Sequence, residues 1–129
     1  MSEKICNYMK MMKEFHNAFC VPISTFPKLL SPEDTIRRLT LITSEVGELG
    51  DALRTKDLAE IADALGDILY VTFGCAVEMG LPMDRIFNDI HQSNMSKIWS
   101  DGEIHKDKGG KVLKPPTFTP VDLTWLRGL

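Results

Sequence analysis

Acidic side chains recur at helical spacing in two neighbouring segments of the sequence. In the first segment Glu45 and Glu48 are three residues apart, so both carboxylates project from the same face of a helix. In the second segment Glu60, Asp63 and Asp67 follow at intervals of three and four residues and also share one face. Carboxylates gathered in this way are suited to bind a hard divalent cation through oxygen ligands.

The apolar surroundings of the second segment distinguish a metal site from solvated surface. Acids at this spacing are common on exposed helices, so Glu45 and Glu48 alone would indicate only surface. The other sides of the second segment are apolar, and an unpartnered carboxylate there is costly unless a cation or a water-filled cleft compensates it. We therefore expect the metal ligands among Glu45, Glu48, Glu60, Asp63 and Asp67. Glu60 has an alternative role, because an acid in the first turn is favoured by the helix dipole alone.

The predicted metal is Mg²⁺, with Mn²⁺ as a substitute. His16, His91 and His105 show no pairing at i, i+4, and the cysteines form no CxxC motif, so the chain lacks the ligands that zinc prefers. Magnesium keeps several waters and binds substrate phosphate oxygens. The expected chemistry is hydrolysis of a polyphosphate by a water that the metal positions or a carboxylate activates.

Four helices are predicted to position these acids. Apolar residues at helical spacing place them at residues 3–19, 32–53, 58–79 and 81–97. Ser31 and Pro32 provide a start signal for the second helix, Asp57 an N-cap for the third, and Gly80 its C-cap. The short connection predicts that the second and third helices run antiparallel, so that their acidic faces meet. The third helix is apolar on nearly every side and is expected to be surrounded by protein.

The predicted architecture is one all-α domain over residues 1–129, a bundle of four to five helices with an extended C-terminal tail. Its helical body spans residues 1–98, and the basic, turn-rich flap and tail at 99–129 contains turn signals at Asp101-Gly102 and Gly109-Gly110. The chain of 129 residues is 43% hydrophobic and has a net charge of −3, which disfavours a nucleic-acid partner. The longest charge-free apolar run, residues 68–77, is about half of the ~20 residues that a membrane span needs. We read no targeting segment, and the unpaired Cys6, Cys20 and Cys75 favour a cytoplasmic location.

Two motifs resemble the MazG-like all-α nucleoside triphosphate pyrophosphohydrolases, a superfamily that includes phosphoribosyl-ATP pyrophosphohydrolase. They are SEVGEL at residues 44–49 and ALGDILY at residues 64–70. The superfamily pattern, ExxE followed by ExxD, places its first pair on Glu45 and Glu48 and its last acid on Asp67. Ala64 stands where the pattern has glutamate. Asp63 next to this gap could supply the missing ligand, and EIAD at residues 60–63 offers an alternative ExxD.

The resemblance extends into the tail and implies a complete function. HQSNMSK at residues 91–97 and GKVLK at 110–114 are similar to elements of one MazG-like subgroup. The family implies a homodimer or a dimer of dimers that cleaves a nucleoside triphosphate between its α and β phosphates, releasing a monophosphate and pyrophosphate. We expect Glu48 to be the general base and Glu45 to assist it.

Four residues near the tail are expected to contact the substrate. Asn94 and Lys97 lie at the end of the predicted fourth helix, and Lys111 and Lys114 lie on the flap. Their side chains could hydrogen-bond phosphate or base. Ordinary solvated surface is the alternative, and for the two flap lysines it is the simpler one.

Two other functions fit part of the pattern. Carboxylates inside helical bundles also build di-iron sites, but such sites normally include a Glu-x-x-His motif, which neither Glu45 nor Glu48 provides. A non-catalytic nucleotide-binding or dimeric scaffold protein of the same fold gains support from Ala64, because a lost ligand could leave binding without turnover. Release of pyrophosphate separates these alternatives.

Overall fold

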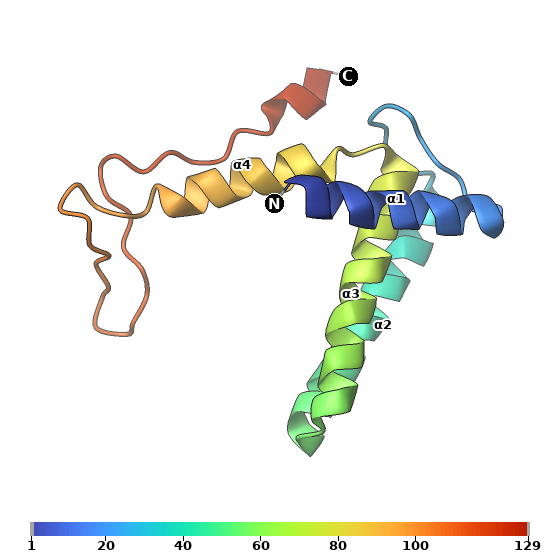
Figure 1. Ribbon diagram of the computed structural model, residues 1–129, viewed down its shortest axis with the longest axis horizontal. Helices are drawn as coiled ribbons and strands as arrows, with labels where there is room; N and C mark the ends of the chain where they lie inside the picture. The colour runs from blue at the N-terminus through green and yellow to red at the C-terminus, as the bar shows by residue number, and fades with distance from the viewer. Residues whose placement is uncertain (1, 129) are drawn as a thin grey trace. The chain divides into compact units, whose positions relative to one another are not determined.

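The structure, a computed structural model, describes the backbone of residues 2–128 and the side chains of residues 7–127. Its elements are α1 (Ser2–Ala18), α2 (Pro32–Thr55), α3 (Leu58–Met79), α4 (Met83–Met95) and a 3₁₀ turn, η1 (Thr124–Gly128) (Figure 1). The predicted all-α class is confirmed. Within the described range no single helix is long and apolar enough to cross a membrane, although α3 and α4 together pass by length and composition. Cys20 and Cys75 are free thiols, and Cys6 lies outside the described side chains.

Contacts divide the chain into two compact units. The first is Glu3–Met83, and the second begins at Asp84 and includes the tail. The predicted single domain with a helical body at residues 1–98 stays a prediction. By its contacts, α4 groups with the tail. One reason is that the Arg85 guanidinium on α4 lies 3.8 Å from the centre of the Trp125 ring, a cation–π contact that joins the helix to η1.

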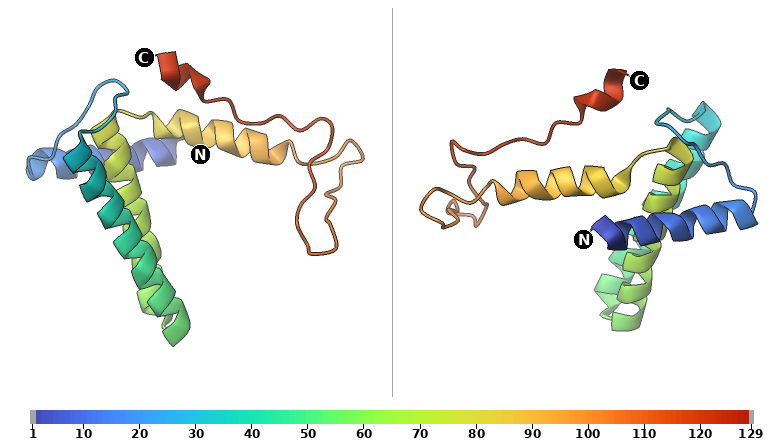
Figure 2. Two further views of the ribbon diagram at one scale, coloured as in Figure 1. Left: turned by 180° about the vertical axis from the view of Figure 1, so that it is seen from behind. Right: turned by 45° about the horizontal axis from the view of Figure 1, so that its top comes forward.

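Local capping groups set the ends of α2 and α3, which run antiparallel side by side (Figures 1 and 2). The Ser31 side chain accepts a hydrogen bond from the Asp34 amide at 3.1 Å, which begins α2. The Asp57 carboxylate accepts from the Ala59 amide at 3.1 Å, which begins α3. Gly80 ends α3 in a left-handed conformation with φ of 69°. These predicted boundaries are confirmed, and the bounds of α3 match those expected.

The loop between α1 and α2 satisfies the last carbonyls of α3. The Ser24 amide donates to the Val77 carbonyl at 3.1 Å, and the Lys28 amide donates to the Met79 carbonyl at 2.9 Å. A Cβ at Gly80 would lie 2.3 Å from the Phe26 carbonyl oxygen, so only glycine fits beneath this loop. The loop between α1 and α2 therefore caps the C-terminal end of α3.

The first unit has a small core and a large uncovered apolar surface. Met12, Ala52 and Val77 are buried, and α1 lies across α3, where the Tyr8 and Phe73 rings are 6.0 Å apart. Leu58 and Leu65 of α3 remain 80% and 49% exposed. The prediction that α3 is surrounded by protein is wrong for the single chain, because α1 and α2 leave part of its apolar circumference uncovered.

The extended tail of the predicted fold class is confirmed, and contacts between its residues hold its turn. The Trp99 and His105 rings stack at 4.4 Å, and the Trp99 indole donates to the Leu113 carbonyl at 3.3 Å. Lys106 and Val112 form an isolated antiparallel bridge, the one β-type pairing within residues 2–128. The glycine-rich turn between them was predicted, but the contacts that hold it link residues too far apart for local patterns to reveal.

Candidate metal centre

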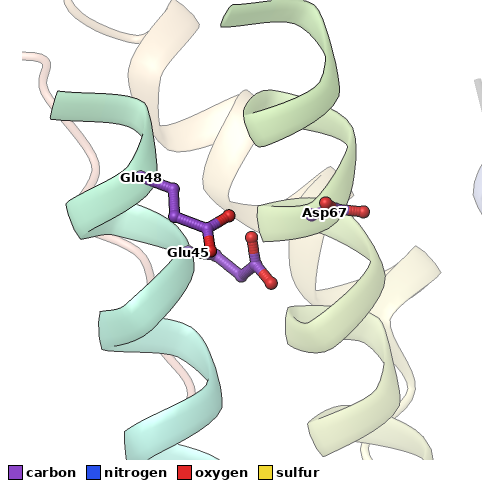
Figure 3. Close-up of side chains that lie close together, drawn as sticks. All are labelled: Glu45, Glu48 and Asp67. Carbon is purple, nitrogen blue, oxygen red and sulfur yellow. The ribbon is translucent and has the colours of Figure 1, made fainter. Parts of the chain in front are cut away.

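Three of the predicted acids converge between α2 and α3. Glu45 and Glu48 project from α2 and Asp67 from α3 (Figure 3). One carboxylate oxygen from each residue lies within 4.8 Å of the others. The antiparallel pairing expected from the short connection therefore brings the two acidic faces together at these three residues.

The neighbouring acids affect the pKa of Glu45. Its Oε2 atom is buried and has no hydrogen-bond partner among the described residues. Partial burial raises the pKa of the Glu45 carboxyl above its ordinary value, and interaction with the Glu48 carboxyl and the negative charges of Asp67 and Asp63 raise it further. Glu48 is exposed and Asp67 is half-buried. The site thus contains a carboxylate whose charge is not compensated by the protein.

These features fit a divalent cation. Three carboxylates supply the hard oxygen ligands that Mg²⁺ and Mn²⁺ prefer, and neither a thiolate nor an imidazole belongs to the cluster. A cation would neutralise the like charges that raise the pKa of Glu45, and it would pair the orphaned Oε2 atom. The donor set and its electrostatics therefore fit a divalent metal ion.

The remaining predicted ligands lie outside this cluster. Asp63 is exposed, yet it is close enough for its charge to affect Glu45. Glu60 is exposed in the first turn of α3, where its amide donates to the Asp57 carboxylate at 3.2 Å. Ala64 is only 3% exposed, so the position where the superfamily pattern has glutamate is occupied by a small packed side chain. Asp63 is therefore the nearest further acid, and its role as a ligand stays a prediction.

The predicted substrate contacts lie in the second unit. Asn94 is exposed in the last turn of α4, and Lys97 follows it half-buried. The Lys111 amide donates to the Asp107 carboxylate at 2.9 Å, and the Lys114 ammonium lies 5.0 Å from the centre of the Phe118 ring. The described contacts of the two lysines are thus within the flap, and their binding of substrate stays a prediction.

Sequence reasoning missed a buried ion pair that fastens the acidic helices together. Arg38 on α2 donates from Nε to Glu78 Oε2 on α3, and Arg37 donates to Glu78 Oε1 at 3.0 Å. Glu78 carried a usable signal, because an acid in the last turn of a helix opposes the helix dipole and needs a cationic partner. Sequence reasoning also missed an aromatic pocket between α1 and α3. Its lining residues are interspersed with ordinary core positions in the sequence, so no local pattern marks them.

Comparison with known proteins agrees with this fold. The family model for phosphoribosyl-ATP pyrophosphohydrolase matches residues 12–94, a range that contains all three clustered acids. The helical fold and this match define a MazG-like all-α nucleoside triphosphate pyrophosphohydrolase fold. Within that superfamily, the chain belongs to the phosphoribosyl-ATP pyrophosphohydrolase family.

One relative comes from Acanthamoeba polyphaga mimivirus, where it is described as an uncharacterized protein. It is 42% identical to this chain over 88 residues. The match covers 65% of this chain and 35% of the viral protein, so the chain spans about a third of that relative's length. The likeness supports a shared helical domain and transfers no activity.

Proposed function

We propose that this protein is a Mg²⁺-dependent nucleoside triphosphate pyrophosphohydrolase that produces a nucleoside monophosphate and pyrophosphate. Family membership gives pyrophosphohydrolase chemistry in general. The observation that carries the finer proposal is the convergence of Glu45, Glu48 and Asp67 within 4.8 Å, with one buried carboxylate oxygen unpartnered. A role in clearing unwanted nucleotides from the cytoplasmic pool follows from such an activity.

Glu45, Glu48 and Asp67 would hold the metal, which when bound neutralises phosphate charge and orients a water. Glu48 is the exposed member of the cluster, so water can reach its carboxylate. Glu48 accepts a proton as the water oxygen bonds to phosphorus. The anhydride bond between the α and β phosphates breaks, and the leaving phosphate oxygen takes the electron pair. Glu45, the other α2 acid of the cluster and half-buried, would orient this water.

One observation favours the second candidate, a nucleotide-binding protein without turnover. Ala64 is packed at 3% exposure, so this position contributes no ligand to the metal. A pyrophosphate-release assay with a panel of ribo- and deoxyribonucleoside triphosphates in Mg²⁺ separates the two functions. We expect release that stops when the metal is chelated. Saturable nucleotide binding without release would establish the alternative.

We further propose that the protein works as a homodimer or a dimer of dimers. On α2, Leu39, Val46 and Leu53 recur every seven residues and are 61%, 51% and 55% exposed. On α3, Leu58 and Leu65 have the same spacing and are also exposed. A seven-residue apolar repeat is typical of a helix that packs along another helix. A second copy of the same hairpin would cover this repeat and supply the missing surroundings of α3.

A further inference from the structure

A cavity of about 440 Å³, here called the tail groove, lies within the second unit between α4 and the tail. The tail runs back beside α4, so a helix forms one wall of the groove and an extended segment forms the other (Figures 1 and 2). The lining residues are mostly polar: Asp89, Gln92, Ser93, Ser96, Thr119, Pro120, Val121 and Asp122. The volume is in the range of cavities that bind small molecules.

Contacts within the protein fasten both ends of the tail groove. Toward the end of α4, the Thr119 amide donates to the Ser96 hydroxyl at 2.9 Å, and this hydroxyl donates to the Ser93 carbonyl at 2.6 Å. Near the start of α4, the Arg85 guanidinium lies 3.8 Å from the centre of the Trp125 ring. The groove is therefore formed before any ligand arrives, which lowers the entropic cost of binding.

The tail groove carries negative charge that its lining does not balance. Asp89 and Asp122 are its charged residues, and no Lys, Arg or His belongs to the lining. Arg85 Nε lies 4.0 Å from Asp89 Oδ2, beyond hydrogen-bond distance, since the guanidinium is over the Trp125 ring. Thr124 donates to Asp122 Oδ1 from its hydroxyl and its amide, and these bonds lower the pKa of the Asp122 carboxyl. Asp122 therefore stays ionised and keeps its Oδ2 atom for a ligand.

The lining excludes two classes of ligand. Two carboxylates repel a phosphate, so the tail groove does not suit a nucleotide. A bare divalent cation prefers several converging oxygen ligands, and the one such group of three acids in the described residues is that of Glu45, Glu48 and Asp67. Pro120 and Val121 also give the groove an apolar strip. Negative charge beside apolar surface suits an organic cation with an alkyl chain.

We propose that the tail groove binds a linear alkylamine that carries two or more ammonium groups. The ammonium groups pair with the carboxylates of Asp89 and Asp122, since each offers three donors and a positive charge. The methylene chain packs against Pro120 and Val121, as the stem of a lysine does on an apolar surface. Asn94, a predicted substrate contact, projects from another face of α4. The inference needs neither a nucleotide nor turnover, so it goes beyond the proposed function.

The first test removes both charges of the tail groove and keeps its shape. Asp89→Asn combined with Asp122→Asn does so, because an asparagine Oδ1 can still accept from Thr124. Isothermal titration calorimetry with a series of linear α,ω-diamines compares the wild type with this double variant. Saturating Mg²⁺ is present throughout, so that the amines do not compete for the acidic cluster. Butylamine and butanediol are the ligands with one and with no ammonium group.

A second variant supplies the ammonium group from the protein itself. Gln92→Lys places a lysine in the lining three residues from Asp89, where an ion pair along the helix can form. The lysine should compete with the diamine while both acids remain. Gln92 is exposed and lysine is a good helix former, so the variant should fold. Asn88→Lys, at an exposed position of α4 outside the lining, adds the same charge and is the matched control.

We expect at least one diamine to bind the wild type saturably, butylamine to bind more weakly and butanediol not to bind. The double variant should weaken diamine binding by about 5- to 30-fold, because two partly exposed ion pairs are lost. Gln92→Lys should weaken it by a similar factor. Asn88→Lys should change it by less than about twofold, since a distant exposed charge is screened by salt.

Four results would overturn the proposal. They are no saturable binding of any diamine to the wild type, equal affinities for the diamines and butylamine, unchanged affinity in the folded double variant, and dissociation of a wild-type oligomer by diamines in light scattering. The last result would assign the groove to a lysine of a second copy. If the double variant loses its helical circular dichroism, the comparison of Gln92→Lys with Asn88→Lys decides, and equal affinities of these two variants reject the site.

Discussion

Arg38 and Glu78 form an ion pair between α2 and α3, with Nε and Oε2 2.5 Å apart and side-chain exposures of 7% and 2%. Arg38 Nη2 is also buried and has no partner in the described part of the chain. The pair lies toward the opposite end of the hairpin from the connection at Lys56. It therefore helps to hold the two helices that carry the acidic cluster.

Glu78→Gln should reduce the free energy of unfolding by about 3–5 kcal/mol, because it leaves the buried Arg38 charge uncompensated. Urea denaturation measures this difference. Asp51→Asn is the control, since it breaks an ion pair with Arg54 in which both side chains are more than 70% exposed. Its cost should be at most about 1 kcal/mol. Equal costs for the two variants would show that the buried pair does not stabilise the hairpin.

Gly74→Ala should destabilise the protein by about 1–3 kcal/mol, the usual cost of overpacking. The new Cβ would lie 3.0 Å from Arg38 Nη1 and 3.3 Å from Met12 Cε, and both neighbours are buried. Gly66→Ala meets no atom and should stabilise by about 1 kcal/mol through helix propensity. Thermal unfolding of both variants checks the difference, and a shift of the same sign in both would contradict it.

Glu48→Gln and Asp67→Asn should each lower Mg²⁺-dependent pyrophosphate release by about 100-fold or more while the helical circular dichroism stays unchanged. Each change keeps the size of the side chain and removes a charge from the cluster. Asp63→Asn asks whether this acid replaces the ligand absent at Ala64, and we expect a smaller loss. Asp51→Asn, an exposed acid on α2, serves as the control. Turnover close to wild type in both cluster variants would disprove the site.

The raised pKa of Glu45 makes a pH-dependent prediction for the metal-free protein. The folded state binds this proton more tightly than the unfolded state, so the ionised cluster weakens folding above the raised pKa. The penalty is relieved as pH falls through that pKa toward the unfolded value. Because the metal competes with the proton, Mg²⁺ or Mn²⁺ should raise Tm more at pH 7.5 than at pH 5. Glu45→Gln should diminish this difference, and an equal Tm shift at both pH values would argue against metal binding at Glu45.

If the protein forms the proposed homodimer or dimer of dimers, Leu39→Glu and Leu53→Glu should convert it to a monomer, because each places a charge within the exposed seven-residue repeat of α2. Sedimentation velocity distinguishes the states. Leu29→Glu changes a leucine that is 87% exposed in the loop before α2, and this control should leave the oligomer intact. If all three variants keep the mass of the wild type, the repeat is not the interface.

The parts of the fold that depend on local sequence were predictable. The caps at Ser31, Asp57 and Gly80 act within a few residues of themselves, so the ends of α3 could be placed from the sequence. The meeting of Glu45 with Asp67 also followed, because a short connection permits only antiparallel packing of the two helices.

The parts that depend on tertiary contacts were not predictable in the same way. Helical periodicity shows that Tyr8 and Phe73 lie on apolar faces, but it does not say that α1 crosses α3 and brings their rings together. Nor does it separate Asp67, which joins the cluster, from Asp63, which has nearly the same angular position one turn earlier. The partners of Arg38 and of Trp99 lie 40 and 14 residues away, beyond the reach of local patterns.

The capping of α3 by the loop between α1 and α2 limits how the hairpin of α2 and α3 can be excised. A fragment that starts at Pro32 would keep all three acids but lose the amides of Ser24 and Lys28, which leaves the terminal carbonyls of α3 without their donors. The shortest autonomous piece must therefore begin upstream of Ser24. Lengthening the segment between Ser24 and Lys28 would also break the spacing that lets both amides reach the C-terminal end of α3.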